Sequence, residues 1–591
     1  MSDPQDDSIT PVTPVTADQL TQIANFGIWA SGPSVNPAAA DVGEALVATL
    51  RGTNAQQVLT ADLQQMVTDV QQIATIGFPW ITAADGKTRL SAHTIKLNTS
   101  EPRPVVIIPS GWTPFGWALF EYTYLQLAKR GYHVLAYTPR GIGLTTHVGG
   151  GRFIDAPWTS QGTIDVGGRK DWSDGFAMID YAQQTFNPSK IAFLGESYGS
   201  GISQLVAAHD ADGRVDAVVA LSAWGNLATA LLGNDTQHLA AVNALTSFTG
   251  GPVERKFDAA TQQILRDFHN GENLHEVRAW AEERSPQNYV DKTNARGIPT
   301  FVSNTWHETL FPVNEVLDTF NALTVPKHLN LWIGDHAAPE SAGLTIPFSG
   351  PNLPVDEAFA WLDHHILGTR NDVPSWPQVN NQVMFTPAVR EGKRSWDEVT
   401  TDTEKLYLGA TPSGSQDGAL GTRPASGWTV SFTTGNLTEA TAVDAVMTTG
   451  QAEWKGNPKI YTTGKFDRRY LATWVSPAGA RRVRGIPRVH LTVTGVGTST
   501  TLVAYLFDLA PDGTATIITH EPYTLTADNP GKAATVTWAL QAAAYDIAAN
   551  HKVMLVINSK DQLYSDTNPA YSTLKISSTA GNESYLDLPL G

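Results

Sequence analysis

The segment from Lys190 to Gly201, K-I-A-F-L-G-E-S-Y-G-S-G, constrains the fold more than any other part of the chain. Its first residues, 191–194, form a short apolar run that is typical of a strand buried on both faces. The pentapeptide G-x-S-x-G follows, and the apolar residues after it predict a helix. Strand, tight turn and helix in this order predict a nucleophile elbow with Ser197 at its apex. A glycine- and serine-rich turn that matches by chance is the alternative interpretation.

Other buried strands are predicted on both sides of this segment, and helical patterns lie between them. The apolar runs are at 104–109, 132–137, 217–221, 298–303 and 329–333. Alternating strands and helices indicate β-α-β units in a doubly wound, mostly parallel sheet, with the active site at the carboxyl ends of the strands. We expect this core to comprise residues 79–224 and 291–372.

The regular alternation of strands stops between these two halves. Residues 225–290 are polar and helical in pattern, which predicts a helical cap inserted over the sheet. A helical insert packed beside the core, with no part in the substrate pocket, is the alternative. Residues 1–78 are interpreted as an N-terminal arm with one amphipathic helix around Leu63–Ile73. Residues 373–591 contain short strands at regular spacing, which predict an all-β sandwich with jelly-roll topology.

Composition excludes several functional classes. The formal net charge of −17 argues against nucleic acid or an anionic membrane surface as a partner. The absence of cysteine excludes disulfides and thiol catalysis. Neither a signal-peptide core nor an 18-residue apolar run is visible, so the sequence predicts a cytoplasmic protein. A homo-oligomer is compatible with the composition.

A serine nucleophile needs a base, and the base needs an orienting acid. Along an α/β-hydrolase chain the order is serine, acid, histidine. Glu308 and His336 meet that order, each just after a late predicted strand. The other carboxylates considered are Asp335, which adjoins the histidine, and Asp318, which falls in the next predicted helix. His364 and His365 lie on the closing helix and are poorer candidates for the base.

The oxyanion hole is predicted to use the backbone N–H of Tyr198 and a donor from the loop around Trp112. Trp224 and Trp306 each follow a predicted strand and are candidate substrate-binding residues. A buried tryptophan of the core is the alternative for each. No metal-binding motif is present, and the glycine run at 148–152 lacks the Lys-Ser/Thr of a phosphate-binding loop. We therefore expect no metal and no cofactor.

Several motifs occur together in an order that resembles the X-prolyl dipeptidyl peptidase / cocaine esterase family. They are D-G-K-T-R-L at 85–90, P-R-G-I-G at 139–143, G-E-S-Y-G at 195–199, R-S-P-Q-N-Y at 284–289, E-T-L-F-P at 308–312, G-D-H-A at 334–337, L-D-H-H-I-L-G at 362–368 and D-L-A-P-D-G at 508–513. The resemblance implies an α/β-hydrolase core, a helical cap, a C-terminal jelly roll and no cofactor. It also implies hydrolysis of an ester or amide of a small molecule or peptide through an acyl-serine.

Two positions depart from the pattern of that family. Members usually have Asp where Glu308 stands, and several use a tyrosine side chain in the oxyanion hole where this chain has Gly111 and Trp112. A dipeptidyl peptidase would also need a carboxylate for the free amine of its substrate, and the cap offers Asp258, Glu272 and Glu276. The alternative function is a catalytically silent hydrolase fold whose jelly roll binds carbohydrate or a surface.

Overall fold

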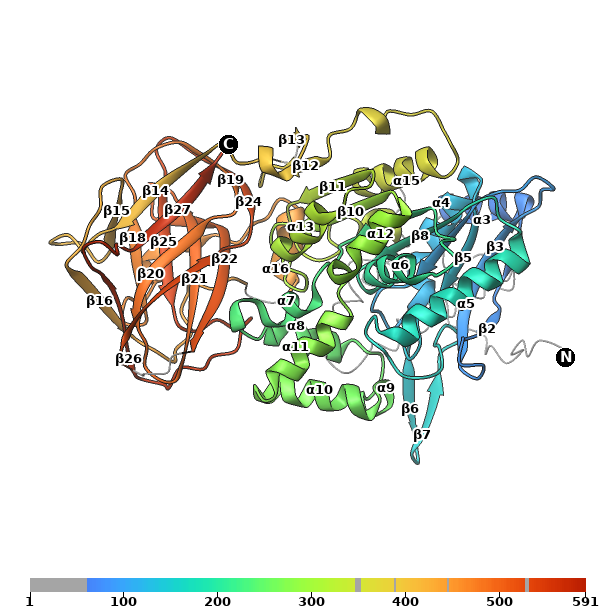
Figure 1. The fold of residues 1–591 in the computed structure, drawn as a ribbon, viewed down its shortest axis with the longest axis horizontal. Coiled ribbons are helices and arrows are strands. Elements are labelled where there is room, and N and C mark those ends of the chain that lie inside the picture. Colours follow the sequence, from blue (N-terminus) through green and yellow to red (C-terminus); the bar gives the residue numbers. More distant parts are fainter. Residues whose placement is uncertain (1–60, 346–351, 387–388, 444–445, 527–530) are drawn as a thin grey trace.

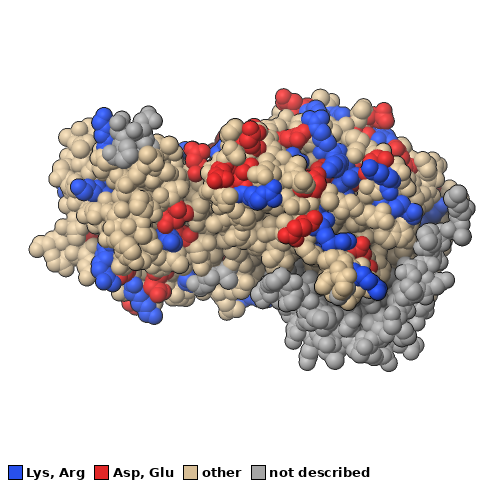
Figure 2. Space-filling model, turned by 90° about the horizontal axis from the view of Figure 1, so that it is seen from below, with Lys and Arg blue, Asp and Glu red and all other residues tan. Residues whose placement is uncertain are grey.

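The computed structural model describes residues 61–345, 352–386, 389–443, 446–526 and 531–591. A mixed sheet with helices on both faces forms the first domain, and a two-layered β-structure forms the second (Figure 1). On the face shown in Figure 2, positive and negative side chains lie intermixed over the first domain. None of the helices within these described segments is both long and apolar enough to span a bilayer.

The first domain is organised around an 11-stranded sheet. Strand order is β1-β3-β5-β4-β8-β9-β10-β11-β12-β13, with β2 paired to β3. From β5 to β12 all neighbours are parallel. The strands are β1 (Ala74–Gly77), β2 (Trp80–Thr82), β3 (Arg89–Leu97), β4 (Val105–Pro109), β5 (His133–Tyr137), β8 (Ile191–Glu196), β9 (Ala217–Leu221), β10 (Thr300–Thr305), β11 (Lys327–Trp332), β12 (Val379–Gln382) and β13 (Arg390–Lys393).

Helices cover both faces because successive side chains of a strand point to opposite sides. In β4, Val106 and Ile108 pack with α3, α4 and α15, whereas Val105 and Ile107 pack with α5, α6 and α13. This arrangement confirms the predicted α/β fold. The helices are α3 (Ala61–Ile73), α4 (Glu121–Arg130), α5 (Arg169–Phe186), α6 (Tyr198–His209), α12 (Val290–Arg296), α13 (Val313–Ala322), α14 (Ser341–Leu344) and α15 (Leu353–His365).

A group of helices is inserted between β9 and β10, where the sequence predicts a cap. They are α7 (Leu227–Leu232), α8 (Leu239–Ser247), α9 (Val253–Lys256), α10 (Ala259–Asn270) and α11 (Leu274–Glu283). A hairpin of β6 (Thr145–Gly149) and β7 (Arg152–Asp155) projects from the domain on the same side (Figure 1). Gly150 and Gly151, which belong to the glycine run at 148–152 in the sequence, form the turn of this hairpin, and Gly149 ends β6.

Within its described residues the C-terminal domain is β-rich, as predicted, with one short α-helix, α16 (Thr448–Trp454), and 3-10 turns at Trp396–Glu398 and Thr463–Lys465. Its longest pair, β21 (Ser499–Leu509) and β22 (Thr514–Thr526), is joined by a turn that contains Pro511, Asp512 and Gly513. The remaining strands are β14 (Asp402–Leu408), β15 (Gly418–Gly421), β16 (Trp428–Thr433), β17 (Tyr461–Thr462), β18 (Leu471–Val475), β19 (Arg481–Gly485), β20 (Arg488–Thr494), β23 (Ala533–Ala539), β24 (Ala543–Ile547), β25 (Lys552–Asn558), β26 (Thr573–Ser578) and β27 (Tyr585–Leu590).

The first sheet extends beyond both limits expected from sequence. At the N-terminal side, β1 pairs with β3, although residues 1–78 were expected to lie outside the core. At the other side, β12 and β13 follow position 373, yet they add to β11 as a parallel strand and its antiparallel neighbour. The strands β12 and β13 are each only four residues long, which is too short for an apolar pattern to identify them from sequence.

Candidate active site

Ser197 stands at the sharp turn between β8 and α6. Its backbone has φ 55° and ψ −122°, a strained conformation for a residue with a side chain. The flanking glycines permit this turn. A Cβ on Gly195 would lie 2.1 Å from the Gly199 carbonyl carbon, and one on Gly199 would lie 2.2 Å from the Pro109 oxygen. The local sequence therefore folds into the predicted elbow, with the serine held above the carboxyl ends of the strands.

His336 comes from the loop after β11 and lies next to this serine. Its Nε2 is 2.7 Å from the Ser197 Oγ, and the ring is fully buried. The other ring nitrogen, Nδ1, is 2.9 Å from the Oε2 of Glu308, which follows β10. The structure thus brings the three sequence-predicted residues into one hydrogen-bonded chain. It has the connectivity of a serine, base and acid triad.

The longer side chain of Glu308 is well accommodated. Its Oε1 accepts the backbone N–H groups of Leu310, at 2.9 Å, and Phe311, at 3.3 Å. Asp335 points elsewhere, because its carboxylate accepts the N–H of Thr309 at 2.8 Å and that of His336 at 2.7 Å. Asp335 thereby links the two loops that carry the acid and the base.

Carboxylates surround the His336 imidazole and control its charge. Burial disfavours the imidazolium, but the charge and hydrogen bond of Glu308, together with Glu196 and Asp335, outweigh it and raise the pKa of His336 to about 9. Burial, followed by the nearby Glu308 charge, raises the pKa of the Asp335 carboxyl to about 7. The surrounding carboxylates therefore stabilise the imidazolium that forms when the ring takes up a proton.

Glu196 is a member of the site that the sequence analysis did not single out. Its Oε1 lies 3.7 Å from His336 Nε2, and a Cβ on Gly111 would lie 2.6 Å from its Oε2. Burial raises the pKa of this carboxyl to about 8. The only sequence signal was its place as the residue before the nucleophile. A carboxyl so placed touches both the base and the loop expected to complete the oxyanion hole.

A cavity opens at Ser197, and we call it the Ser197 cavity. Its wall combines apolar side chains and the Glu196 carboxyl with three hydroxyl-bearing residues. The apolar ones are Trp112, Leu119, Phe120, Ala337 and Leu344, and the hydroxyls belong to Thr113, Ser341 and Thr345. Trp112 also contacts the cap, since its Nε1 donates to the Leu245 carbonyl of α8 at 2.9 Å. The Ser197 cavity therefore suits a compact group that has an apolar part and also carries polar atoms.

Tyr198 occupies the first position of α6, so its N–H has no acceptor four residues earlier in the helix. Its ring is anchored below the site. The hydroxyl donates to Asp171 at 2.5 Å and accepts the Gly167 N–H at 3.2 Å. The Trp112 ring packs edge-on against it, with centroids 5.2 Å apart.

The other two candidate tryptophans are not among the side chains that line the Ser197 cavity. The Trp224 ring covers α6, where a Cβ on Gly201 would lie 2.0 Å from it, and its Nε1 donates to the Arg284 carbonyl at 3.0 Å. Trp306 is 1% exposed and donates to the Gln382 carbonyl at 2.9 Å. Both positions correspond to the core tryptophan that was the alternative interpretation.

The cap carboxylates also lie outside the residues that line the Ser197 cavity. Asp258 caps α10 by accepting the Thr261 N–H at 2.9 Å, and it pairs with Lys170 at 2.9 Å. Glu276 is exposed and lies 3.2 Å from His275. Within the segments described, no cluster of three or more His, Asp or Glu side chains is arranged to hold a metal ion.

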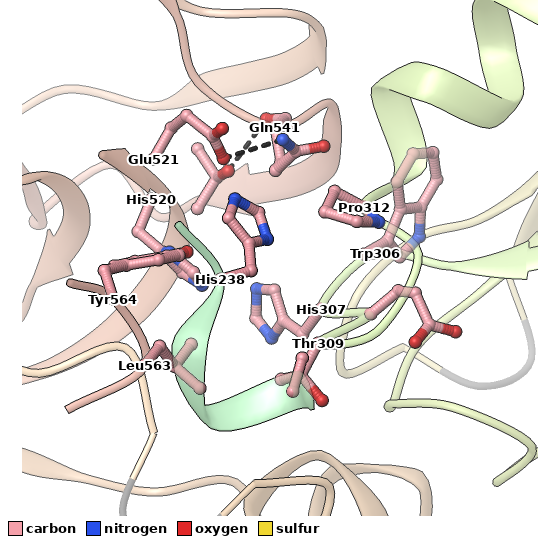
Figure 3. A pocket seen from close by; sticks show the side chains of 13 residues that line it. His238, Trp306, His307, Thr309, Pro312, His520, Glu521, Gln541, Leu563 and Tyr564 are labelled. Carbon is pink, nitrogen blue, oxygen red and sulfur yellow. Dashed lines mark hydrogen bonds between the residues drawn. The ribbon is translucent and has the colours of Figure 1, made fainter. Parts of the chain in front are cut away.

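A second pocket lies where the core, the cap and the C-terminal domain meet (Figure 3). Trp306 and His307 line it from the core, His238 from the cap, and His520 and Tyr564 from the C-terminal domain. Glu308 also contributes to its wall, so this pocket borders the acid of the triad on the side away from Ser197.

Comparison with known proteins assigns the family. Residues 85–338 match the model of X-Pro dipeptidyl-peptidase (S15 family), and residues 371–586 match that of the X-Pro dipeptidyl-peptidase C-terminal non-catalytic domain. The chain belongs to the S15 peptidase family. The family resemblance inferred from sequence is thereby confirmed, and the chain is a member of a hydrolase family. No curated protein matches the sequence.

Solved structures of similar fold extend over both domains of this S15 family member. An aminopeptidase from a marine sediment archaeon, Thaumarchaeota archaeon, has a TM-score of 0.62 at 13% identity, covering 87% of this chain and 96% of its own. A CocE/NonD family hydrolase from Staphylococcus aureus gives 0.62 at 11%, covering 91% and 99%. An alpha-amino acid ester hydrolase gives 0.63 at 14%, covering 88% and 97%. At these identities the likeness establishes the fold.

Proposed function

We propose that this protein is a serine hydrolase that cleaves an ester or amide bond through an acyl-serine intermediate. The observation that carries the proposal is the continuous hydrogen-bonded chain from Ser197 through His336 to Glu308, with distances of 2.7 and 2.9 Å. The same residues follow the chain order of α/β-hydrolase triads. Membership of a hydrolase family supports the assignment.

In the first step, Ser197 Oγ attacks the substrate carbonyl while His336 Nε2 takes the hydroxyl proton. Glu308 keeps the Nδ1–H oriented and stabilises the imidazolium that forms. The tetrahedral oxyanion receives hydrogen bonds from the Tyr198 N–H and from a backbone N–H of the Gly111–Trp112 loop. When the carbonyl reforms, the bond to the leaving group breaks and Nε2–H gives that group its proton.

The second step repeats the first with water in place of the serine. His336 removes a proton from the water, whose oxygen attacks the acyl carbon of the ester on Ser197. Collapse of this second tetrahedral intermediate releases the acid, and His336 returns the proton to Ser197 Oγ. No other group is required for the atoms and charges to balance.

The substrate class is proposed from the wall of the Ser197 cavity. Apolar contacts with Trp112, Leu119 and Phe120 favour a compact acyl group, and the family adds peptides that begin with X-Pro as candidates. Short-chain nitrophenyl esters and X-Pro-nitroanilides separate the ester and peptide alternatives directly. Preference for one panel by more than about 100-fold in kcat/KM would identify the bond cleaved.

The decisive test is labelling with a fluorophosphonate, which needs no knowledge of the substrate. We expect wild-type protein to be labelled and Ser197→Ala to lose labelling together with about 10⁴- to 10⁶-fold in turnover. Ser203→Ala is a matched control, since that hydroxyl donates to the Gly199 carbonyl within the same helix at 2.7 Å. Unlabelled wild-type protein would favour the alternative of a silent hydrolase fold with a binding jelly roll.

A further inference from the structure

The only α-helix described in the C-terminal domain, α16, lies against the first domain. Figure 1 shows it at the first domain, apart from the strands of the sandwich that surround it in sequence. Its backbone comes close to the loop that bears the base. A Cβ on Gly450 would lie 2.3 Å from the Cβ of Asp335, so only glycine allows this approach. The helix therefore contacts the residue next to His336 directly.

Gln451 of α16 makes a hydrogen bond to the base residue itself. Its side-chain Nε2 donates to the main-chain carbonyl of His336 at 3.0 Å, in a buried environment. The imidazole projects from this backbone segment, and its Nε2 must stay within hydrogen-bond reach of Ser197. The hydrogen bond to the His336 carbonyl therefore fixes the backbone position from which the imidazole projects.

Glu453, half a helical turn after Gln451, makes a buried pair with His307, the residue before the acid Glu308. Its Oε2 lies 2.8 Å from Nδ1 of His307, and the two side chains are only 3% and 8% exposed. The Nε2 of His307 lies 3.0 Å from the Ile518 carbonyl. Because both ring nitrogens face acceptors, the protonated form of the His307 ring is stabilised. Figure 3 shows this ring at the second pocket, adjacent in sequence to Glu308.

We propose that α16 is a positioning element of the active site, through which the C-terminal domain sets the relative placement of His336 and Glu308. The proposal rests on the proposed function of the triad. Gln451 holds the base loop, Glu453 holds the acid loop through His307, and Asp335 joins the two loops between them. A domain known by family as non-catalytic thereby takes part in orienting the reacting groups.

The physical basis is the narrow tolerance of proton transfer. A displacement of about 1 Å at the reacting groups can cost about 100-fold in rate. Apolar packing alone resists such a shift weakly along the interface, whereas a buried hydrogen bond and a buried charged pair each fix one direction. These two polar contacts are made to the base residue and to the residue before the acid. A shift at these positions would reduce the rate of proton transfer most.

The experiment measures the rate of Ser197 labelling by a fluorophosphonate as a function of probe concentration, in the full-length chain. Gln451→Met keeps the length and volume of the side chain without the donor, and Glu453→Gln removes one charge with almost no change of shape. Thr448→Ala, at an exposed position of the same helix, is the control. We expect the two test variants to lose about 10- to 100-fold in the saturating rate constant. Half-saturating concentrations should stay within about 3-fold.

The outcomes separate this proposal from the assignment of the nucleophile. Labelling that persists in Ser197→Ala overturns both. If labelling depends on Ser197 but Gln451→Met and Glu453→Gln react like wild type, only the positioning role is overturned. The same holds if these variants change only the half-saturating probe concentration. Thermal melts report folding, and should Gln451→Met fail to fold, the result for Glu453→Gln decides.

Discussion

His336 Nε2 lies 2.7 Å from Ser197 Oγ, although 139 residues separate the two along the chain. They belong to loops after β8 and β11, and the strands β9 and β10 lie between these two in the sheet. The contact therefore depends on the order of four parallel strands. Proton transfer between the two groups requires that the whole sheet edge be assembled.

Glu308→Asp tests whether the extra methylene of the acid is matched to its loop. Shortening the side chain withdraws the carboxylate by about 1.5 Å, while Leu310 and Phe311 hold the loop in place. We expect kcat to fall about 10- to 100-fold with little change in KM. Steady-state kinetics on a nitrophenyl ester measure this, with the exposed Asp318→Asn as control. An unchanged kcat would show that the carboxylate does not act on His336 at its present distance.

Glu196→Gln should shift the pH dependence of the enzyme. His336 accepts the serine proton only when it is neutral, so kcat/KM rises with pH through its pKa of about 9. Burial lowers that pKa and the surrounding carboxylates raise it, Glu196 among them. Removing one negative charge must therefore move the rising limb to lower pH. Rates between pH 5 and 10 measure the midpoint, and a midpoint that stays in place or rises would contradict the electrostatic role.

Gly201→Ala should destabilise the fold, because the new methyl would overlap the Trp224 ring at 2.0 Å. Overpacking of this kind costs about 1–3 kcal/mol. Urea unfolding measures the loss, and Gly464→Ala, where nothing lies within 4 Å, is the control expected within about 0.5 kcal/mol. A neutral result at Gly201 would mean that Trp224 can leave its place over α6.

Glu453→Gln should lower stability in a pH-dependent way. Burial disfavours charge on His307, but Glu453 outweighs it and raises the pKa of His307 from 6.5 to about 8. Because the pKa of His307 is higher in the folded state than in the unfolded state, its protonation stabilises the fold. This contribution to the free energy of unfolding is complete below pH 6.5 and disappears as the pH rises through 8. The difference is worth about 2 kcal/mol.

Urea unfolding of wild type and Glu453→Gln at pH 6 and pH 9 tests this. The gap in free energy of unfolding should be largest at pH 6 and nearly closed at pH 9. The gap between wild type and Thr448→Ala should not vary with pH. A gap for Glu453→Gln that widened toward pH 9 would reverse the sign and refute the pairing.

Much of the fold was predictable because local patterns report local structure. The apolar run of 217–221 coincides with β9, and that of 132–137 covers β5. These strands are buried or alternate regularly, so periodicity identifies them. Strands β12 and β13 escaped prediction, because four residues are too few to show a period. The pairing of β12 with β11, and of β13 with β12, is also decided only in the tertiary structure.

The residues of the site also fall into those that the sequence predicts and those that it does not. Ser197 was recognisable from its turn, and His336 and Glu308 from their places after strands. Glu196 was not, because a residue beside the nucleophile can point in several directions and only the glycine at 111 leaves room for its carboxyl. Trp224 and Trp306 also follow strands, yet their rings turn into the core.

By itself, the sequence determined the elbow, the alternation of strands and helices, and the order of nucleophile, acid and base, since these depend on neighbours along the chain. Tertiary structure alone decided that Glu308 and not Asp335 faces the imidazole, that Glu196 approaches it, and that α16 supports both loops. The direction of a side chain is set by what packs around it. Here those neighbours come from other segments of the chain: Glu308 lies 28 residues from His336, and Gln451 of α16 lies 115 residues from it.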